Sequence, residues 1–151
     1  MTNQPADTEF TIVEDVCVPG ANPDHHLIDH QTQALLTELW TAYLAQIRSA
    51  IPANGVHPVM RRVSYSLENE AFPEQPLRRG IRMLSRSRRS CTFAAAVWHP
   101  DDGRMVHVGE MVTVFVDPSI AAAVEIPAEL WAEVERFEGR SIPTGAGPAS
   151  S

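Results

Sequence analysis

The chain has 151 residues, a formal net charge of −7 at pH 7 and a hydrophobic fraction of 44%. This length suits one domain that buries enough surface to fold without a disulfide or a metal, and the acidic balance argues against nucleic acid as a partner. No apolar run approaches the roughly 20 residues of a membrane span, and the polar stretch Met1–Thr8 lacks the features of a signal peptide. We therefore expect a cytoplasmic protein with no membrane contact.

The composition along the chain predicts one folded domain between two tails. We expect flexible tails at residues 1–8 and 140–151, the second because RSIPTGAGPASS is rich in Gly, Pro and Ser. Residues 9–139 form the domain. Cys17 and Cys91 lie far apart in apolar, strand-like segments, which favours two reduced core thiols over a bridge.

The first half of the domain predicts a strand and then a long helix. The strand covers Phe10–Val18, although Glu14 and Asp15 fit it poorly. The helix begins near Asp29. Its apolar residues recur at i, i+1, i+4 and i+5 over more than three turns, the pattern of one buried face: Leu35, Leu36, Leu39, Trp40, Tyr43, Leu44 and Ile47.

Four strand-like segments and a short helix follow. The strands lie at about 62–67, Leu77–Arg86, Cys91–His99 and Arg104–Asp117. The turn Asp101–Gly103 predicts a hairpin between the last two strands. The closing helix covers Pro127–Phe137, with a proline near its first turn. One face of the last strand is shared by Val106, Val108, Val112, Val114 and Val116.

This order of elements predicts the fold class. Consecutive strands without crossover helices should pair antiparallel. One long helix with one apolar face must pack on the sheet they form. The pattern therefore predicts an α+β domain that has one antiparallel sheet of about five strands.

Several segments resemble a known family. DDGRMVHVGEMVTVFVDP, followed by IPAELWAEV, resembles the last strands and closing helix of the 4-hydroxybenzoyl-CoA thioesterase-like family of acyl-CoA thioesterases, which have the hotdog fold. Pro76–Gly80 and Arg89–Phe93 resemble the starts of two of its middle strands. His26–Asp29 resembles the approach to its central helix. The resemblance covers about Phe10 to Glu138 and implies a sheet wrapped around the helix, in a homodimer or homotetramer with the active site at a subunit interface.

Thioester hydrolysis needs a base or nucleophile, N–H groups that stabilise an oxyanion, and cationic anchors for coenzyme A. The resemblance assigns the oxyanion to the backbone N–H groups of Asp29 and His30. One subgroup of the family has its catalytic Asp where this chain has Asn22, and an amide cannot act as the base. Another subgroup uses a Glu on the central helix, and Glu38 is the acid on this helix.

The candidate catalytic residues are therefore Glu38, His26 and His25, with supporting roles for Asn22 and Asp29. Each candidate has a structural alternative. A helix acid opposite the apolar face usually meets water, the histidines suit a polar loop, and Asp29 suits a helix cap. No matching ligand pair elsewhere supports a metal site, so we expect no metal and no cofactor, with coenzyme A only as part of the substrate.

An arginine-rich stretch interrupts the acidic sequence, with no acid inside it. It fits an anchor for the phosphates of CoA or for an acidic carrier protein, or else a solvated strand face and turn. Among these residues, we predict that Arg86, Arg88 and Arg89 bind CoA, together with the adjacent Ser90. The stretch contains Arg78, Arg79, Arg82, Arg86, Arg88 and Arg89.

The function we expect is hydrolysis of an acyl-CoA or acyl-carrier thioester. One alternative is a hotdog hydratase or dehydratase that acts on an enoyl or hydroxyacyl thioester, because Asn22–His25 resembles part of the D-x-N-P-x-H motif of that group. Gly20 stands at the leading Asp position, which leaves the acid–base pair incomplete. Another alternative is a non-catalytic hotdog protein that binds acyl-CoA.

Overall fold

The computed structural model describes residues 9–20, 25–51 and 55–145. The segment predicted at 77–86 coincides with a strand, and the other predicted elements are confirmed with shifted ends. The 62–67 strand begins earlier, at His57. The elements in chain order are β1 (Ile12–Val16), α1 (Asp29–Gln46), the 3₁₀ turn η2 (Arg48–Ala50), β2 (His57–Leu67), β3 (Leu77–Arg86), β4 (Ser90–Trp98), β5 (Met105–Asp117), β6 (Ala122–Ala123) and α2 (Ala128–Glu138).

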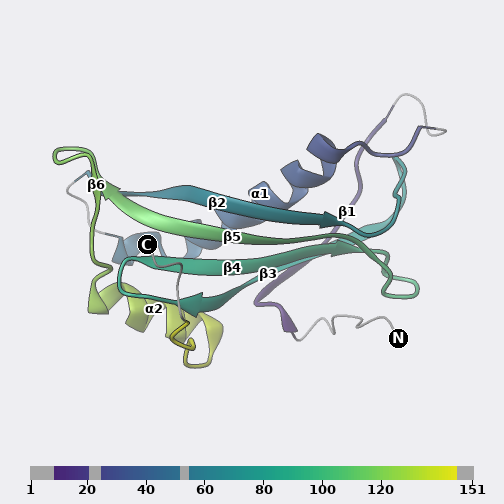
Figure 1. The fold of residues 1–151 in the computed structure, drawn as a ribbon. Helices are drawn as coiled ribbons and strands as arrows, with labels where there is room; N and C mark the ends of the chain where they lie inside the picture. Colours follow the sequence, from purple (N-terminus) through teal and green to yellow (C-terminus); the bar gives the residue numbers. More distant parts are fainter. Residues whose placement is uncertain (1–8, 21–24, 52–54, 146–151) are drawn as a thin grey trace. The chain divides into compact units, whose positions relative to one another are not determined.

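The five long strands form one antiparallel sheet in the order β1-β3-β4-β5-β2, and the short β6 pairs with β5 (Figure 1). The expectation that consecutive strands are neighbours holds for β3, β4 and β5 but is wrong for β2. The loop at residues 68–76 carries the chain from one side of the sheet to the other, so β2 pairs with β5 instead of β3. The α+β prediction is confirmed.

The long helix α1 packs on the sheet through its apolar face. Leu36 of the helix approaches Gly109 of β5 so closely that a Cβ at this glycine would lie 3.1 Å from the leucine side chain. His107, Gly109 and Met111 alternate with the predicted valine positions and are buried. The face of β5 toward α1 is therefore the one that carries His107 and Gly109, and the valines lie on the opposite face.

By their contacts the described residues form two compact units. The first contains residues 1–41, 65–82 and 95–109, as far as they are described. Within it, Phe10 stacks on Trp98 with ring centroids 5.4 Å apart. A Cβ on Gly80 would lie 2.7 Å from the Phe10 ring, so only glycine leaves room for this contact. The N-terminal segment thus covers part of β3 and β4.

The second unit contains residues 42–64, 83–94 and 110–151, again within the described ranges. Its centre is Tyr43, whose ring meets Phe93 and Phe137 edge to face at 4.8 and 5.1 Å. The Tyr43 hydroxyl donates a hydrogen bond of 2.6 Å to Glu138 of α2. The Glu138 side chain is only 1% exposed and also accepts hydrogen bonds from the Met83 N–H at 2.8 Å and from Arg140 at 3.2 Å.

Residues 140–145, predicted as the start of a flexible tail, lie along β3. Ile142 is 3% exposed, and Arg86 and Thr144 form an isolated parallel bridge. The tails predicted at 1–8 and at 146–151 fall outside the described residues. The prediction of two core thiols is right for Cys91, which is buried, and wrong for Cys17, which is exposed beyond the end of β1.

The hydrogen bonds that Glu138 accepts from Tyr43, Met83 and Arg140 lead to a prediction about stability. Glu138→Ala removes the acceptor for the Tyr43 hydroxyl, the Met83 N–H and the half-exposed Arg140, and should lower the free energy of unfolding by roughly 3 kcal/mol, because unpaired buried polar groups are costly. Glu133→Ala in the same helix, where the pair with Arg136 is at the surface, should cost less than about 1 kcal/mol. Urea unfolding measures both. Equal losses would show that Glu138 is not a structural anchor.

Candidate functional site

The start of α1 is held in place by the loop between β2 and β3. Leu27 is 2% exposed, and its N–H donates a hydrogen bond of 2.6 Å to the carbonyl of Ala71. The same loop is fixed from the end of β4, because Nε2 of His99, the residue after this strand, lies 3.1 Å from the carbonyl oxygen of Glu70. The approach to the helix is therefore anchored by one main-chain hydrogen bond to a loop that a histidine side chain holds in turn.

The first turn of α1 is capped by a side chain. Ile28 precedes the helix, and its carbonyl accepts from the N–H groups of Gln31 and Thr32 at 3.0 and 3.3 Å. Gln31 reaches back to accept a 3.0 Å hydrogen bond from the Ile28 N–H, as in a capping box. The residue in the cap position is thus Ile28, and the alternative of Asp29 as the cap is wrong.

Asp29 and His30 are the first two residues of the helix, and both are exposed. Helix geometry leaves the first N–H groups without an intrahelical acceptor. These N–H groups can therefore bind an oxygen that develops negative charge. The Asp29 carboxylate accepts a 3.0 Å hydrogen bond from the side chain of Gln33, one turn further along.

The histidine candidates lie beside this helix start. His25 and His26 are exposed and precede the helix by three or four residues. Asn22 falls outside the described residues. The structure thus brings His25, His26 and the two N–H groups of the first turn into one short segment.

Glu38 lies further along the same helix and is already paired. Its carboxylate is 2.5 Å from Arg79 of β3 and its side chain is 61% exposed. Arg79 also pairs with Glu14 of β1 at 2.5 Å and donates a 3.0 Å hydrogen bond to the carbonyl of Leu35. Since the Arg79 side chain is only 13% exposed, this cation ties β1, β3 and α1 together.

The position of Glu38 also separates it from the helix start. Glu38 follows His30 by eight positions, which corresponds to roughly 12 Å along the axis at the rise of an α-helix. A small group such as a thioester carbonyl cannot contact the first-turn N–H groups and the Glu38 carboxylate of one chain together. His26 and His25 are better placed than Glu38 to act there.

The arginine-rich stretch divides into paired and exposed members. Arg78 pairs with Asp15 at 2.8 Å, and Arg79 is held as described above. Both acids come from β1, which lies opposite β3 in the register Glu14–Arg79 and Asp15–Arg78. These two arginines are therefore neutralised by the neighbouring strand.

The remaining CoA candidates surround the turn between β3 and β4. Arg88 is 70% exposed and has one loose contact, 3.6 Å to Glu125, and Arg89 is exposed as well. The guanidinium of Arg86 lies over the Trp131 ring, 4.9 Å from its centroid. Ser90 is 2% exposed, and its hydroxyl is 2.7 Å from that of Ser87. Arg88 and Arg89 are thus the candidates most accessible to a phosphate.

A buried histidine, His107 of β5, was not among the predicted site residues. It is 0% exposed, and among the described residues neither ring nitrogen has a hydrogen-bond partner. Leaving such a group unsatisfied costs about 1–3 kcal/mol, which calls for an explanation. The ring packs against Tyr65 of β2 with centroids 4.8 Å apart. The only signal in the sequence is a histidine amid the valines of this strand.

The environment of His107 keeps its imidazole neutral. Burial lowers the pKa of His107 below its ordinary value of 6.5, while the nearby Asp29 carboxylate raises it and offsets part of the effect. A neutral imidazole carries one donor and one acceptor. It lies on the face of the sheet toward α1, in the same unit as the helix start.

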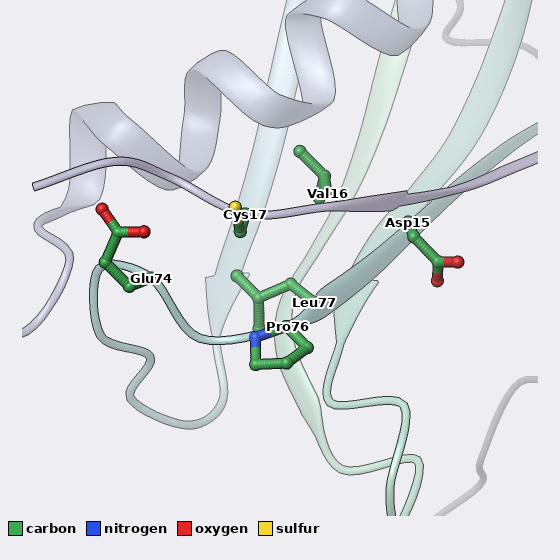
Figure 2. A pocket seen from close by; sticks show the side chains of 6 residues that line it. All are labelled: Asp15, Val16, Cys17, Glu74, Pro76 and Leu77. Carbon is green, nitrogen blue, oxygen red and sulfur yellow. The ribbon is translucent and has the colours of Figure 1, made fainter.

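A surface depression of about 350 Å³ lies where the chain leaves β1 and enters β3 (Figure 2). It contains none of the predicted site residues. Its polar groups include the carboxylates of Asp15 and Glu74, which would repel the phosphates of CoA. It is lined by Asp15, Val16, Cys17, Glu74, Pro76 and Leu77.

Neither a metal cluster nor a membrane span is found in the part of the chain that the structure describes. No group of three or more His, Cys, Asp or Glu side chains there is arranged to hold a metal ion. No helix among these residues is long and apolar enough to cross a membrane.

The comparisons with known proteins identify the fold. No family model matches the sequence, and no curated protein matches it either. A mutant of 4-hydroxybenzoyl CoA thioesterase complexed with 4-hydroxybenzoyl CoA has a TM-score of 0.69 at 16% identity, over 82% of this chain and 97% of that one. A Thermus thermophilus thioesterase complexed with coenzyme A and Zn has a TM-score of 0.69 at 18% identity, over 88% and 98%.

The probable thioesterase YbaW from Escherichia coli is similar as well, with a TM-score of 0.70 at 14% identity, over 83% of this chain and 97% of that one. Identities this low establish the fold alone. The chain has the hotdog fold that the sequence predicts, and the distant structures that share it include acyl-CoA thioesterases, some of them bound to CoA.

The neutral state of His107 predicts a specific loss of stability in acid. The unfolded chain takes up a proton near pH 6.5, whereas the folded chain does so only at lower pH. The free energy of unfolding should therefore fall as the pH drops from 6.5 through the folded-state pKa, by at most ~1.4 kcal/mol per pH unit for one group. His107→Phe should remove this part of the decline in urea unfolding series.

His57→Gln is the matched control, because His57 is exposed at the start of β2. This variant should keep the acid sensitivity of the wild type. A His107→Phe protein that loses stability in acid as steeply as the His57→Gln protein would disprove the assignment.

Proposed function

We propose that this protein hydrolyses acyl thioesters of coenzyme A or of an acyl carrier protein. The observation that carries the proposal is the anchored start of α1, where the N–H groups of Asp29 and His30, which have no acceptor within the helix, lie next to two exposed histidines. The shared fold with thioesterases, two of them solved with CoA or 4-hydroxybenzoyl CoA, supports the same reaction class. The cytoplasmic location expected from the sequence stays a prediction.

In the proposed reaction, water attacks the thioester carbonyl carbon. The N–H groups of Asp29 and His30 donate hydrogen bonds to the carbonyl oxygen as it gains negative charge. A neutral histidine, His26 or His25, accepts the proton of the attacking water and returns it to the departing sulfur. The C–S bond breaks, and the products are a carboxylic acid and the free thiol.

Arg88 and Arg89 are proposed to hold the phosphates of CoA. Both are exposed on the turn after β3, and Arg88 has only a loose partner. Arg86 is held over the Trp131 ring, and its positive charge is proposed to attract the phosphates from that position. We assign Ser90, which is buried, to the shape of this turn through its contact with Ser87.

A homodimer or homotetramer is the proposed assembly. β1 and β2 are the terminal strands of the described sheet, and β2 has 11 residues with Val59 and Leu67 more than a third exposed. A long edge strand that exposes apolar side chains is a pairing surface unless it is covered. A second copy that covered α1 would also allow Glu38 to act as the base.

The direct test is release of free thiol from a panel of short, long and aromatic acyl-CoAs, measured with a thiol reagent. Enzyme-dependent release from at least one of them is the expected result. Saturable binding without release would show a non-catalytic acyl-CoA-binding protein. Loss of enoyl absorbance without thiol release would show a hydratase.

The identity of the base is tested by comparing kcat in four variants. His26→Ala or His25→Ala should lower kcat by roughly 100-fold, because general-base assistance is worth 10²–10⁴ in rate. Glu38→Gln should lower kcat less, since Arg79 already holds that carboxylate. Asn22→Asp should keep or raise activity. Near-full kcat in both histidine variants would rule out a histidine base, and a large loss in Glu38→Gln alone would favour Glu38.

The turn that carries Arg88 and Arg89 is predicted to contribute to the affinity for acyl-CoA. The double change of Arg88 and Arg89 to Ala should raise KM for acyl-CoA more than it lowers kcat, because the phosphates are remote from the reacting carbon. The difference should shrink at high salt, where exposed charges are screened. Arg136→Ala, at an exposed position of α2, is the matched control. Unchanged KM at low salt in the double variant would exclude this turn from the CoA site.

A further inference from the structure

The chain segment that follows α2 has no part in the proposed reaction, yet its place in the fold is well defined. α2 ends at Gly139, whose left-handed backbone (φ 72°) redirects the chain. Residues 140–145, the C-terminal strap, then lie along β3. Ile142 of the strap is 3% exposed, and its N–H donates a hydrogen bond of 3.0 Å to the carboxylate of Glu135. The strap is therefore held by α2 as well as by β3.

The strap bonds the main chain of Arg86, the last residue of β3, through both of its polar groups. The Arg86 N–H donates a hydrogen bond of 3.0 Å to the carbonyl of Pro143, and the Arg86 carbonyl accepts one of 3.0 Å from the N–H of Gly145. These two bonds form the isolated parallel bridge between Arg86 and Thr144. Gly145 fits closely, because a Cβ there would lie 3.0 Å from the Ser85 side chain. The strap thus fixes the point at which the chain leaves β3.

The chain then enters the basic turn, residues 87–89, which carries Arg88 and Arg89. The Ser87 N–H donates a hydrogen bond of 2.8 Å to the carbonyl of Ser90, and the Arg88 carbonyl accepts one of 3.0 Å from the N–H of Ile126. Ile126 is only 4% exposed, whereas the Arg88 side chain is 70% exposed. The main chain of the basic turn is therefore ordered, while the Arg88 guanidinium is presented to solvent.

This order matters for the binding of an anion. A loop or side chain that must be immobilised on binding reduces the affinity, and a main chain that is already ordered avoids the loop part of that cost. The strap carries one cation, Arg140, which is committed to Glu138 and to the carbonyl of Met83. Any effect of the strap on an anion must therefore pass through the basic turn.

We propose that the C-terminal strap is a positioning element of the CoA site. Its hydrogen bonds to Arg86 order the basic turn, so that Arg88 and Arg89 meet the phosphates of CoA without a further loss of main-chain freedom. This inference rests on the proposed function, since it takes Arg88 and Arg89 as the phosphate anchors.

The test changes the strap without changing any charge. Gly145→Pro removes the N–H that Arg86 accepts, because proline has no backbone donor. Gly145→Ala keeps this N–H but presses a Cβ against Ser85. Thr144→Pro is the matched control, because it introduces the same ring one residue earlier, where parallel pairing directs the N–H away from β3.

All three changes are made in the full-length protein and again in a background in which Arg88 and Arg89 are both changed to Ala. Equilibrium binding of CoA is measured by calorimetry, and thermal unfolding is recorded for every variant. The two backgrounds form a double-mutant cycle, which isolates the coupling between the strap and the arginines.

The wild type should bind CoA, and Gly145→Pro should weaken this binding about fivefold, the value of one main-chain hydrogen bond. Gly145→Ala should weaken it less, and Thr144→Pro should bind CoA like the wild type. In the background without the two arginines, neither change of Gly145 should weaken binding further. A merely structural role would instead give the same loss in both backgrounds.

The inference is overturned by an unchanged affinity in Gly145→Pro, or by equal losses in the two backgrounds. If Gly145→Pro does not fold, Gly145→Ala decides by the same criterion. Thiol release from acyl-CoAs separates the strap from the proposed function. Release that depends on Arg88 and Arg89 but not on Gly145 would retain the function and remove the strap. Strap-dependent CoA binding without release would retain the strap and remove the reaction, and a wild type that does not bind CoA would remove both.

Discussion

The burial of one face of α1 against the sheet is the constraint on which the rest of the structure depends. Leu36 and Leu39 are 0% exposed, and Gly109 removes the side chain that would keep the helix away from β5. Once this contact is made, the first turn of the helix has a fixed place. The hydrogen bond from Leu27 to Ala71 then holds the preceding segment against the loop between β2 and β3.

Electrostatic pairing decides which charged groups remain for chemistry. Arg79 pairs with both Glu14 and Glu38, and Arg78 pairs with Asp15. Buried Glu138 is committed to Tyr43 and to the main chain of β3, where burial raises the pKa of the Tyr43 hydroxyl far above its ordinary value. At the helix start, His25 and His26 are exposed and lie beside backbone N–H donors, a combination that suits water activation and oxyanion binding.

Much of the fold could be predicted from the sequence because it depends on local periodicity. The spacing of Leu35, Leu39 and Tyr43 predicts the long helix, and the segment 77–86 reads directly as a strand. The position of β2 could not be predicted, because strand order depends on where a loop crosses and not on local pattern. The same limit applies to Arg78 and Arg79, whose partners on β1 lie more than 60 residues away in the sequence.

The candidate site was predictable only in part. His25, His26, Asp29 and His30 form one continuous segment, so their proximity follows from the sequence alone. His107 was missed because a histidine within a valine-rich strand gives no sign of whether its ring nitrogens find partners. The pairing of Glu38 with Arg79 is likewise a property of the folded chain.

A crystal structure with a ketone analogue of acyl-CoA is the most direct test of the central claim, that the start of α1 is where the thioester is hydrolysed. The account predicts the analogue's carbonyl oxygen within hydrogen-bonding distance of the N–H groups of Asp29 and His30, with His26 or His25 beside the carbonyl carbon. An analogue bound with its carbonyl away from this helix start would contradict the account.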